Sequence, residues 1–187
     1  MSESSEERSQ RTQRIERWLS IAVGVAAIVA VMVSLYQARL AREQLRASAW
    51  PYISQGNSFA NGTPFRRFVS NDGIGPARIR SFRVIVDGHP VPTWNAAVRA
   101  LTGEGDPGLV YSSVGRGTVL APGASRTVLT LQPSPRTLRF VIALQTRLRT
   151  QVCYCSVYDE CWNTDSEADE PSRVNSCSAD TTAEFRQ

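Results

Sequence analysis

One uninterrupted apolar segment constrains this chain more than any other feature. Residues 18–36 read WLSIAVGVAAIVAVMVSLY, nineteen residues without a charged side chain. A helix rises about 1.5 Å per residue, so this segment would be roughly 28 Å long, close to the hydrocarbon thickness of a bilayer. Trp18 and Tyr36 stand at its two ends, where interfacial aromatic side chains are typical. The sequence therefore predicts a single transmembrane helix over residues 18–36, with the lipid bilayer as its first partner.

A cleaved signal peptide is the main alternative, because arginines precede the apolar segment. The segment is long for a signal peptide, however, and no small-residue cleavage site closes it. We therefore expect an uncleaved anchor. The polar residues 1–17 are predicted to form a disordered cytoplasmic tail. Helix-forming residues continue after the membrane, so residues 37–50 are predicted to form a helical stalk that ends before Pro51.

The orientation of the anchor depends on the cysteines more than on charge. Four arginines precede the apolar segment and three follow it closely, so the positive-inside rule is nearly balanced. All four cysteines lie on the C-terminal side, and an even number of cysteines is typical of small domains in oxidising compartments. We expect the N-terminus inside the cytoplasmic (inner) membrane and the C-terminal domain outside it, in the periplasm or extracellular space.

After Pro51 the helical pattern gives way to short alternating segments separated by Gly and Pro turns. Residues 77–86 predict a strand with a bulge near Ser81, and Asp87-Gly88 predicts a hairpin turn. Residues 95–108 are expected to be loop with one helical turn. The longest predicted strand covers residues 138–154, with a bend near 146–149.

Short strands at this spacing, without helices between them, predict an antiparallel β-sandwich of the immunoglobulin or fibronectin type. We place this domain at residues 51–162 and predict that the acidic residues 163–187 are mostly disordered. The fold class is therefore mainly β, with one N-terminal transmembrane helix and its stalk.

Two short motifs carry a resemblance to other proteins. QLRASAWPYI (44–53) follows the apolar segment directly, and NDGIGPARI (71–79) follows some twenty residues later. Over residues 15–90 the chain resembles a group of uncharacterised bacterial single-pass membrane proteins, in which a helix stops at Trp-Pro and a small β-sandwich follows. The resemblance implies this architecture and implies no activity. The segment CYCSVYDECW (153–162) departs from the pattern.

The cysteine spacing predicts two disulfides. Cys153 and Cys155 are two residues apart on a predicted strand, so they share a face but are poorly placed to bond each other. Cys155 and Cys161 flank SVYDE, which can form a hairpin loop, and Cys153 would then pair with Cys177; this is the pairing we choose among the three that four cysteines allow. The alternatives are a zinc site built from the four thiolates, although no C-x-x-C pair is present, and free thiols. Disulfides are favoured, so we predict no metal and no cofactor.

Small residues recur every four positions along the apolar segment. They line one helix face, which would let a second helix approach closely. We therefore consider self-association, or contact with another membrane protein, through these residues, whereas the alternative is that alanine is simply abundant in such segments. The residues are Ala22, Ala26, Ala30 and Ser34.

Charge is unevenly distributed along the C-terminal part of the chain. Residues 37–152 hold fifteen arginines and five carboxylates, whereas residues 153–187 hold two arginines and eight carboxylates. The basic part could bind an anionic ligand, or the acidic tail could fold back and neutralise it; we favour neutralisation. The candidate anion-binding residues are Arg66, Arg67, Arg78, Arg80, Arg147 and Arg149.

The sequence predicts no enzyme. The single histidine, His89, lies in DGHP, where an exposed turn residue is expected, and acid–base or triad chemistry usually needs a histidine beside a nucleophile. We expect a membrane-anchored, non-enzymatic interaction or accessory module that displays its domain to an extracytoplasmic protein partner. The alternative is a cytoplasm-facing sensor or effector that binds a nucleotide or nucleic acid through its arginines.

Overall fold

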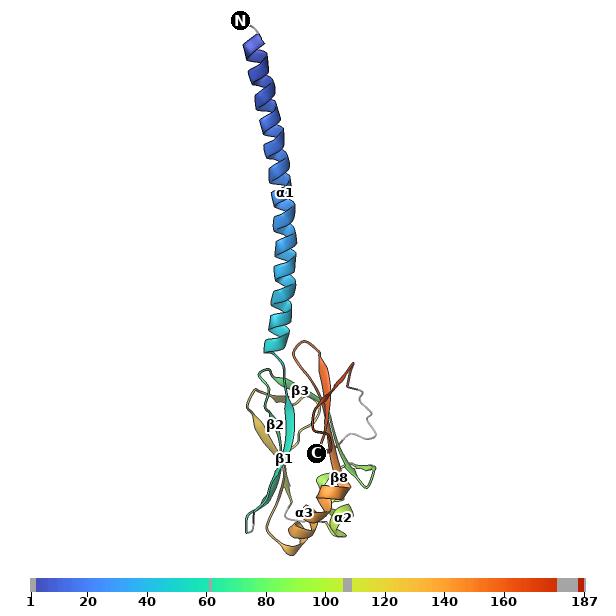
Figure 1. The fold of residues 1–187 in the computed structure, drawn as a ribbon. Coiled ribbons are helices and arrows are strands. Elements are labelled where there is room, and N and C mark those ends of the chain that lie inside the picture. Colours follow the sequence, from blue (N-terminus) through green and yellow to red (C-terminus); the bar gives the residue numbers. More distant parts are fainter. Residues whose placement is uncertain (1–2, 61, 106–108, 178–184, 187) are drawn as a thin grey trace. The chain divides into compact units, whose positions relative to one another are not determined.

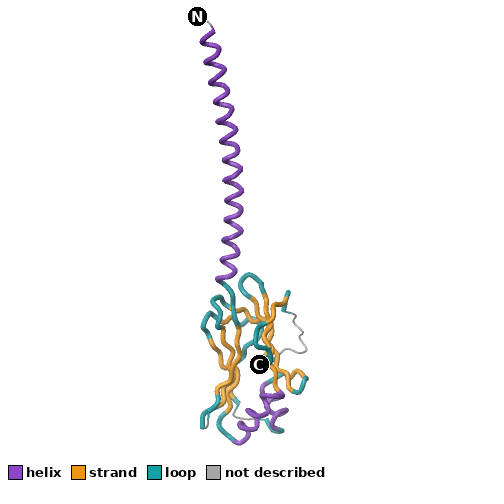
Figure 2. Tube along the Cα trace, in the orientation of Figure 1, coloured by secondary structure: helices purple, strands orange, loops and turns teal. Residues whose placement is uncertain are grey.

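The computed structural model describes residues 3–60, 62–105, 109–177 and 185–186. The chain divides into two compact units, Met1–Ala47 and Ser48–Gln187. The first unit is the greater part of one helix, α1 (Glu3–Ser48), and the second is a domain made mainly of strands (Figures 1 and 2). Within the described residues, one helical segment, Arg14–Ser48, is long and apolar enough to cross a membrane.

The helix α1 begins earlier than predicted. Residues 3–17 are helical, not disordered. Their sequence contains no glycine or proline, and each residue added to an existing helix gains one hydrogen bond, so the apolar segment can propagate the helix towards the N-terminus. At its other end, α1 stops at Ser48, as the Trp-Pro motif predicts.

The β domain contains two antiparallel sheets, which together hold ten strands among the described residues. The first sheet has the order β1-β2-β7-β5, and the second has the order β10-β9-β8-β3-β4, with β6 paired to β3. The bounds of the first sheet are β1 (Ile53–Ser58), β2 (Phe65–Asn71), β7 (Ser125–Leu131) and β5 (Val110–Tyr111). Those of the second are β3 (Ala77–Val86), β4 (His89–Val91), β6 (Val119–Leu120), β8 (Leu148–Cys155), β9 (Cys161–Asp165) and β10 (Ser172–Val174).

Side chains from both sheets form one hydrophobic core. Phe65 of β2 packs edge-on against Phe140, with 5.6 Å between ring centroids. The predicted bulge near Ser81 is confirmed, because the pairing of β3 with β8 shifts register between Ile79 and Ser81. The predicted Asp87-Gly88 hairpin turn is also confirmed: both residues have positive φ, and β3 pairs with β4 beyond them.

The long strand predicted over residues 138–154 is wrong in its first half. Residues Pro135–Arg147 form helix α3, and the strand β8 begins only at Leu148, within the region where a bend was predicted. Ser134 caps the helix by accepting a hydrogen bond from the Thr137 N–H at 3.1 Å, and Pro135 occupies the first turn. Phe140 and Leu144, four residues apart, are its buried apolar residues, which is helical spacing.

A second helix occupies much of the predicted loop, where one helical turn was expected. Helix α2 (Trp94–Thr102) begins after Thr93, whose hydroxyl accepts from the Ala96 N–H, and ends at Gly103 with φ of 85°. Trp94 is the first helical residue. Its ring packs against Phe185 near the C-terminus, with 5.1 Å between centroids.

The acidic C-terminal residues are more ordered than predicted. Strand β9 crosses the predicted domain boundary at residue 163, and β10 pairs with β9. Cys177 is disulfide-bonded, and Phe185 is buried, with its N–H donating to the Phe82 carbonyl at 3.1 Å. Residues 178–184 lie outside the described part of the chain. Covalent bonding and core packing therefore hold a segment whose composition alone predicts disorder.

Candidate functional site

Both predicted disulfides lie at one end of the second sheet. Cys155 and Cys161 are directly opposed on the antiparallel pair β8–β9, with 4.0 Å between their Cα atoms. Cys153 is bonded to Cys177, with 5.7 Å between their Cα atoms. This is the pairing that the spacing predicts. Because each of the four sulfurs is bonded to another, this oxidised form offers no thiolate for the zinc site considered as an alternative.

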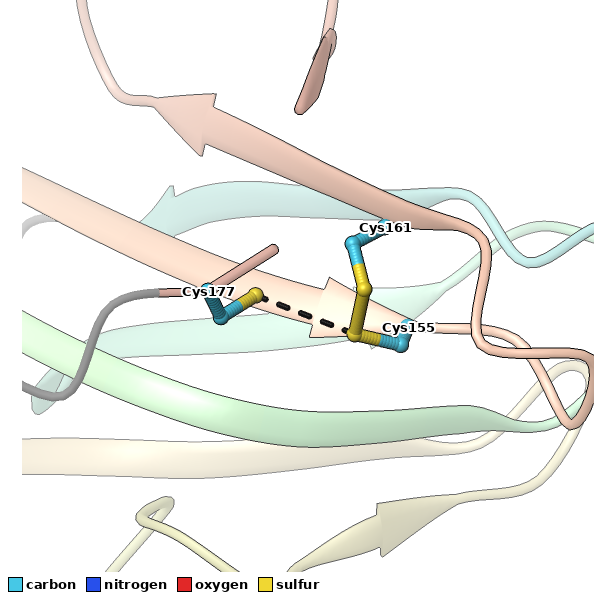
Figure 3. Close-up of side chains that lie close together, drawn as sticks. All are labelled: Cys155, Cys161 and Cys177. Carbon is cyan, nitrogen blue, oxygen red and sulfur yellow. Dashed lines mark hydrogen bonds between the residues drawn. A yellow bond between two sulfur atoms is a disulfide. The ribbon is translucent and has the colours of Figure 1, made fainter. Parts of the chain in front are cut away.

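The two disulfides lie next to each other. The Sγ atoms of Cys155 and Cys177 are 3.8 Å apart, and the sulfurs of Cys155, Cys161 and Cys177 all lie within 4.8 Å of one another (Figure 3). Cys155 and Cys161 are buried, whereas Cys153 and Cys177 are only partly buried. The bond between Cys153 and Cys177 is therefore the more accessible of the two.

Two surface hollows flank this pair of disulfides. The larger, of about 270 Å³, contains three cysteines and the side chains of two arginines. Its lining residues are Arg80, Arg116, Cys155, Asp159, Cys161, Asn175, Ser176 and Cys177. The second hollow, of about 200 Å³, contains Cys153 among polar residues. Its lining residues are Ser81, Arg83, Gln151, Cys153, Asn163, Val174 and Ser176.

Carboxylates from the C-terminal part of the chain bind several of the candidate arginines. Asp159, in the loop between β8 and β9, forms an ion pair with Arg78. Its Oδ1 also lies 3.4 Å from Nη2 of Arg80. Arg149 pairs with Asp165 at 2.5 Å and with Glu167 at 2.9 Å. These contacts support the interpretation in which the acidic segment neutralises the basic one.

Two carboxylates that bind candidate arginines, Asp165 and Asp87, have lowered pKa values. Burial raises the pKa of Asp165, but hydrogen bonds from Arg149 and Gln151 outweigh it, so the pKa lies below its usual range. The pKa of Asp87 is lowered chiefly by the hydrogen bond from Arg147, whose guanidinium lies 2.5 Å away. Both carboxylates are therefore held in the charged form by arginines that were candidates for ligand binding.

The other two candidate arginines behave differently from each other. Arg67 is 4% exposed and lies between the sheets, where it donates to Asn57 Oδ1 at 2.9 Å and to the Thr150 hydroxyl. Burial lowers its pKa to about 10. Arg66, the next residue on β2, is exposed. The six candidates thus do not form one basic face; among them the structure brings together only Arg78 and Arg80, through Asp159.

The two motifs that carry the resemblance meet in the structure. The backbone of residues 49–52 lies against the turn at residues 71–75, so closely that a Cβ on Gly75 would fall 2.0 Å from the Ala49 carbonyl oxygen. Asn71 is fully buried at the centre of this contact. Its Oδ1 accepts from the N–H groups of Tyr52 and Gly73, and its Nδ2 donates to two backbone carbonyls, those of Gly75 and Leu120.

Large apolar side chains are exposed at this same end of the β domain. Trp50 is 45% exposed, and its carbonyl accepts hydrogen bonds from the N–H groups of Ile74, which is 64% exposed, and Gly75. Val157 and Tyr158 are exposed in the β8–β9 loop. Because Arg78 of β3 pairs with Cys155 of β8, this loop and residue 74 leave the same end of the sheet. We call Trp50, Ile74, Val157 and Tyr158 the apolar rim.

The rim was not predicted from the sequence. Its only signal there is the presence of large apolar residues inside turn-forming segments, NDGIG and SVYDE.

The remaining candidate residues are His89 and the small residues of α1. His89 is exposed and begins β4 after the hairpin turn. Ala22, Ala26, Ala30 and Ser34 are exposed on α1, and the Ser34 hydroxyl donates to the Ala30 carbonyl at 2.8 Å.

Comparisons with protein-family models and with curated proteins find no match for this chain. The resemblance to bacterial single-pass proteins therefore stays a prediction about architecture, and the function is argued from the residues alone.

Proposed function

We propose that this protein is a membrane-anchored, non-enzymatic interaction module. The helix α1 would cross the cytoplasmic membrane with its N-terminus inside, and the β domain, of immunoglobulin or fibronectin type, would lie outside. Two observations support the location: a helix long and apolar enough to span a bilayer, and two disulfides, which are typical of an oxidising compartment. The observation that carries the function is the apolar rim.

Exposed apolar clusters on a soluble surface mark contact sites more often than chance. The rim includes a tryptophan and a tyrosine, which are enriched in protein interfaces, and charged residues such as Arg80 and Asp159 lie beside it. An apolar centre with polar surroundings is the usual composition of a specific protein interface.

The length of the stalk favours a protein over lipid as the occupant of the rim. Residues 37–48 extend α1 beyond the predicted membrane segment by about 18 Å. The headgroup layer is only about 5–7 Å thick, and an average tilt of ~20° shortens the stalk by little more than 1 Å. The helix would therefore end roughly 10 Å beyond the headgroups, and Trp50 follows this end by two residues along the chain. We therefore propose an extracytoplasmic protein as the partner.

The alternative function, a cytoplasmic sensor for an anionic ligand, has less support. Four of the six candidate arginines are bound by carboxylates, and Arg67 is buried. A basic surface that its own chain already neutralises offers little charge to a polyanion.

Site-specific photo-crosslinking in intact cells tests the proposal. A photoreactive amino acid would replace Ile74 in the rim or Ile142 on α3, in the full-length protein. The two isoleucines have the same exposed fraction, 64%, and lie beyond opposite ends of the strands β3 and β8. We expect a discrete crosslinked protein from position 74 and none from position 142. Equal crosslinking at both positions, or none at either, would count against the rim as an interface.

A further inference from the structure

The two adjacent disulfides suggest a chemistry that the interaction function does not need. We propose that they form a thiol–disulfide exchange site, at which an external dithiol opens Cys153–Cys177 and the released Cys177 then attacks Cys155. The substrate class is a dithiol, either a small molecule or a protein with two neighbouring thiols. The proposal rests on the positions of the four sulfurs and is independent of the apolar rim.

The first step occurs at the accessible disulfide. Cys153 lines the hollow of about 200 Å³ on the sheet surface, so a thiolate can approach its sulfur from solvent. The incoming thiolate bonds to the Cys153 Sγ and breaks the bond to Cys177, which leaves as a thiolate. The second thiol of the reagent then attacks the mixed disulfide, so that Cys153 becomes a thiol and the reagent leaves oxidised to its own disulfide. Two electrons pass from the reagent to the protein.

The second step moves the remaining disulfide. The leaving Cys177 Sγ lies 3.8 Å from the Cys155 Sγ, which is still bonded to Cys161 (Figure 3). Once released, the Cys177 side chain turns to the side of Cys155 that lies opposite Cys161, as displacement at sulfur requires. Cys177 then bonds to Cys155, and Cys161 leaves as a thiolate that takes up a proton. No electrons are gained or lost in this step. The product keeps one disulfide, Cys155–Cys177, with thiols at Cys153 and Cys161.

Nearby charges favour the thiolate that links the two steps. Arg80 and Arg116 line the same hollow as Cys177. The one carboxylate among the lining residues, Asp159, is bound by Arg78 as well as lying near Arg80. The excess of guanidinium groups stabilises a thiolate at Cys177 and so increases the fraction that can attack. A disulfide joins the C-terminal segment to β8 through Cys153 before the exchange and through Cys155 after it.

The wild-type protein allows a direct test, because trypsin separates the cysteines conveniently. Cleavage after Arg149, Arg173 and Arg186 places Cys153, Cys155 and Cys161 in peptide 150–173 and Cys177 in peptide 174–186. Full-length protein in detergent would be treated with limiting dithiothreitol, alkylated in acid at successive times, digested and analysed by mass spectrometry.

The expected two-electron product has the two peptides still linked, with alkylated Cys153 and Cys161. Further cleavage after Glu160 would show that the link runs through Cys155. Release of peptide 174–186 with alkylated Cys177 as the final two-electron product, with Cys155–Cys161 intact and no Cys155–Cys177 link formed at any time, would overturn the proposal. So would simultaneous loss of both disulfides.

A matched pair of variants tests the role of charge. Arg116→Gln should slow the second step, so that the transient species with thiols at Cys153 and Cys177 accumulates. Arg139→Gln changes an exposed arginine on α3 and should leave the time course unchanged. An identical time course for both variants would remove Arg116 from the mechanism.

Discussion

Replacing Asn71 by aspartate tests the hydrogen bonds that hold the chain where it leaves the helix. The change keeps the side-chain shape and keeps Oδ1 as an acceptor for Tyr52 and Gly73. It replaces Nδ2, which donates at 2.8 Å to the Gly75 carbonyl and at 3.0 Å to the Leu120 carbonyl, by an oxygen that faces both acceptors. Two buried carbonyls thereby lose their donor.

Each buried group left without a partner costs about 1–3 kcal/mol. With two carbonyls affected, we expect Asn71→Asp to lower the free energy of unfolding by about 2–6 kcal/mol, which is a large part of the stability of a small domain. Because burial raises the pKa of a carboxyl group, part of the loss should be recovered below about pH 5, where the protonated acid regains one donor.

The assay is guanidinium unfolding of the full-length protein in detergent, followed by tryptophan fluorescence. Asn175→Asp serves as the matched control, because Asn175 is exposed near the C-terminus. The control should differ from wild type by less than ~0.5 kcal/mol. An Asn71→Asp variant as stable as this control would refute the assignment of Asn71 as the residue that holds residues 49–52 against the turn at 71–75.

Three further predictions use the same unfolding assay. Replacing both Cys153 and Cys177 by serine opens a loop with a sequence separation of 24 and should cost about 3.5 kcal/mol; an unchanged midpoint would argue against this disulfide. Arg67→Ala should cost about 3 kcal/mol, whereas Arg67→Met should lie within about 1 kcal/mol of wild type, since methionine fills the space without a buried charge; the reverse order would contradict this. Asp165→Asn should destabilise the protein at pH 7. The pKa of Asp165 is lowered in the folded state, so its contribution is present above its unfolded pKa of about 3.9 and is lost as the pH falls through the folded value. The difference from wild type should therefore shrink as the pH falls below the unfolded pKa, and a constant difference would exclude the Arg149 interaction as its cause.

The sequence predicts those features that depend on local chemistry. Trp50-Pro51 predicts the end of the helix within two residues, and Asp87-Gly88 predicts the hairpin turn. The cysteine pairs follow from the length of one hairpin loop and from the geometry of a strand. Except for the pair Cys153–Cys177, which has a sequence separation of 24, residues close in sequence determine these results.

Features that depend on distant contacts were harder to predict. In residues 138–144, apolar residues at every second position fit a strand, yet the same residues include the pair Phe140 and Leu144 at helical spacing. Only the cap at Ser134 and Pro135 distinguishes the two patterns locally. The burial of Arg67 depends on the packing of β2 against Thr150 of the other sheet, and no local pattern indicates it.

The apolar rim could not be predicted from the sequence either, because it combines residues from three separate segments. Trp50, Ile74 and the pair 157–158 lie at the same end of the β domain only once β3 has paired with β8 and the turn at 71–75 has packed against residues 49–52. A large apolar residue inside a turn motif was the available signal. Such residues are common singly on protein surfaces, so the signal gains weight only when they gather at one place.

The location of the β domain is the central claim, and thiol labelling in intact cells tests it most directly. A membrane-impermeant maleimide would be added before and after reduction, with and without permeabilising the inner membrane, and the mass of the protein measured. We expect all four cysteines to be labelled only after reduction and without permeabilisation. Labelling without prior reduction, and only after permeabilisation, would place the domain in the cytoplasm with free thiols and contradict the account.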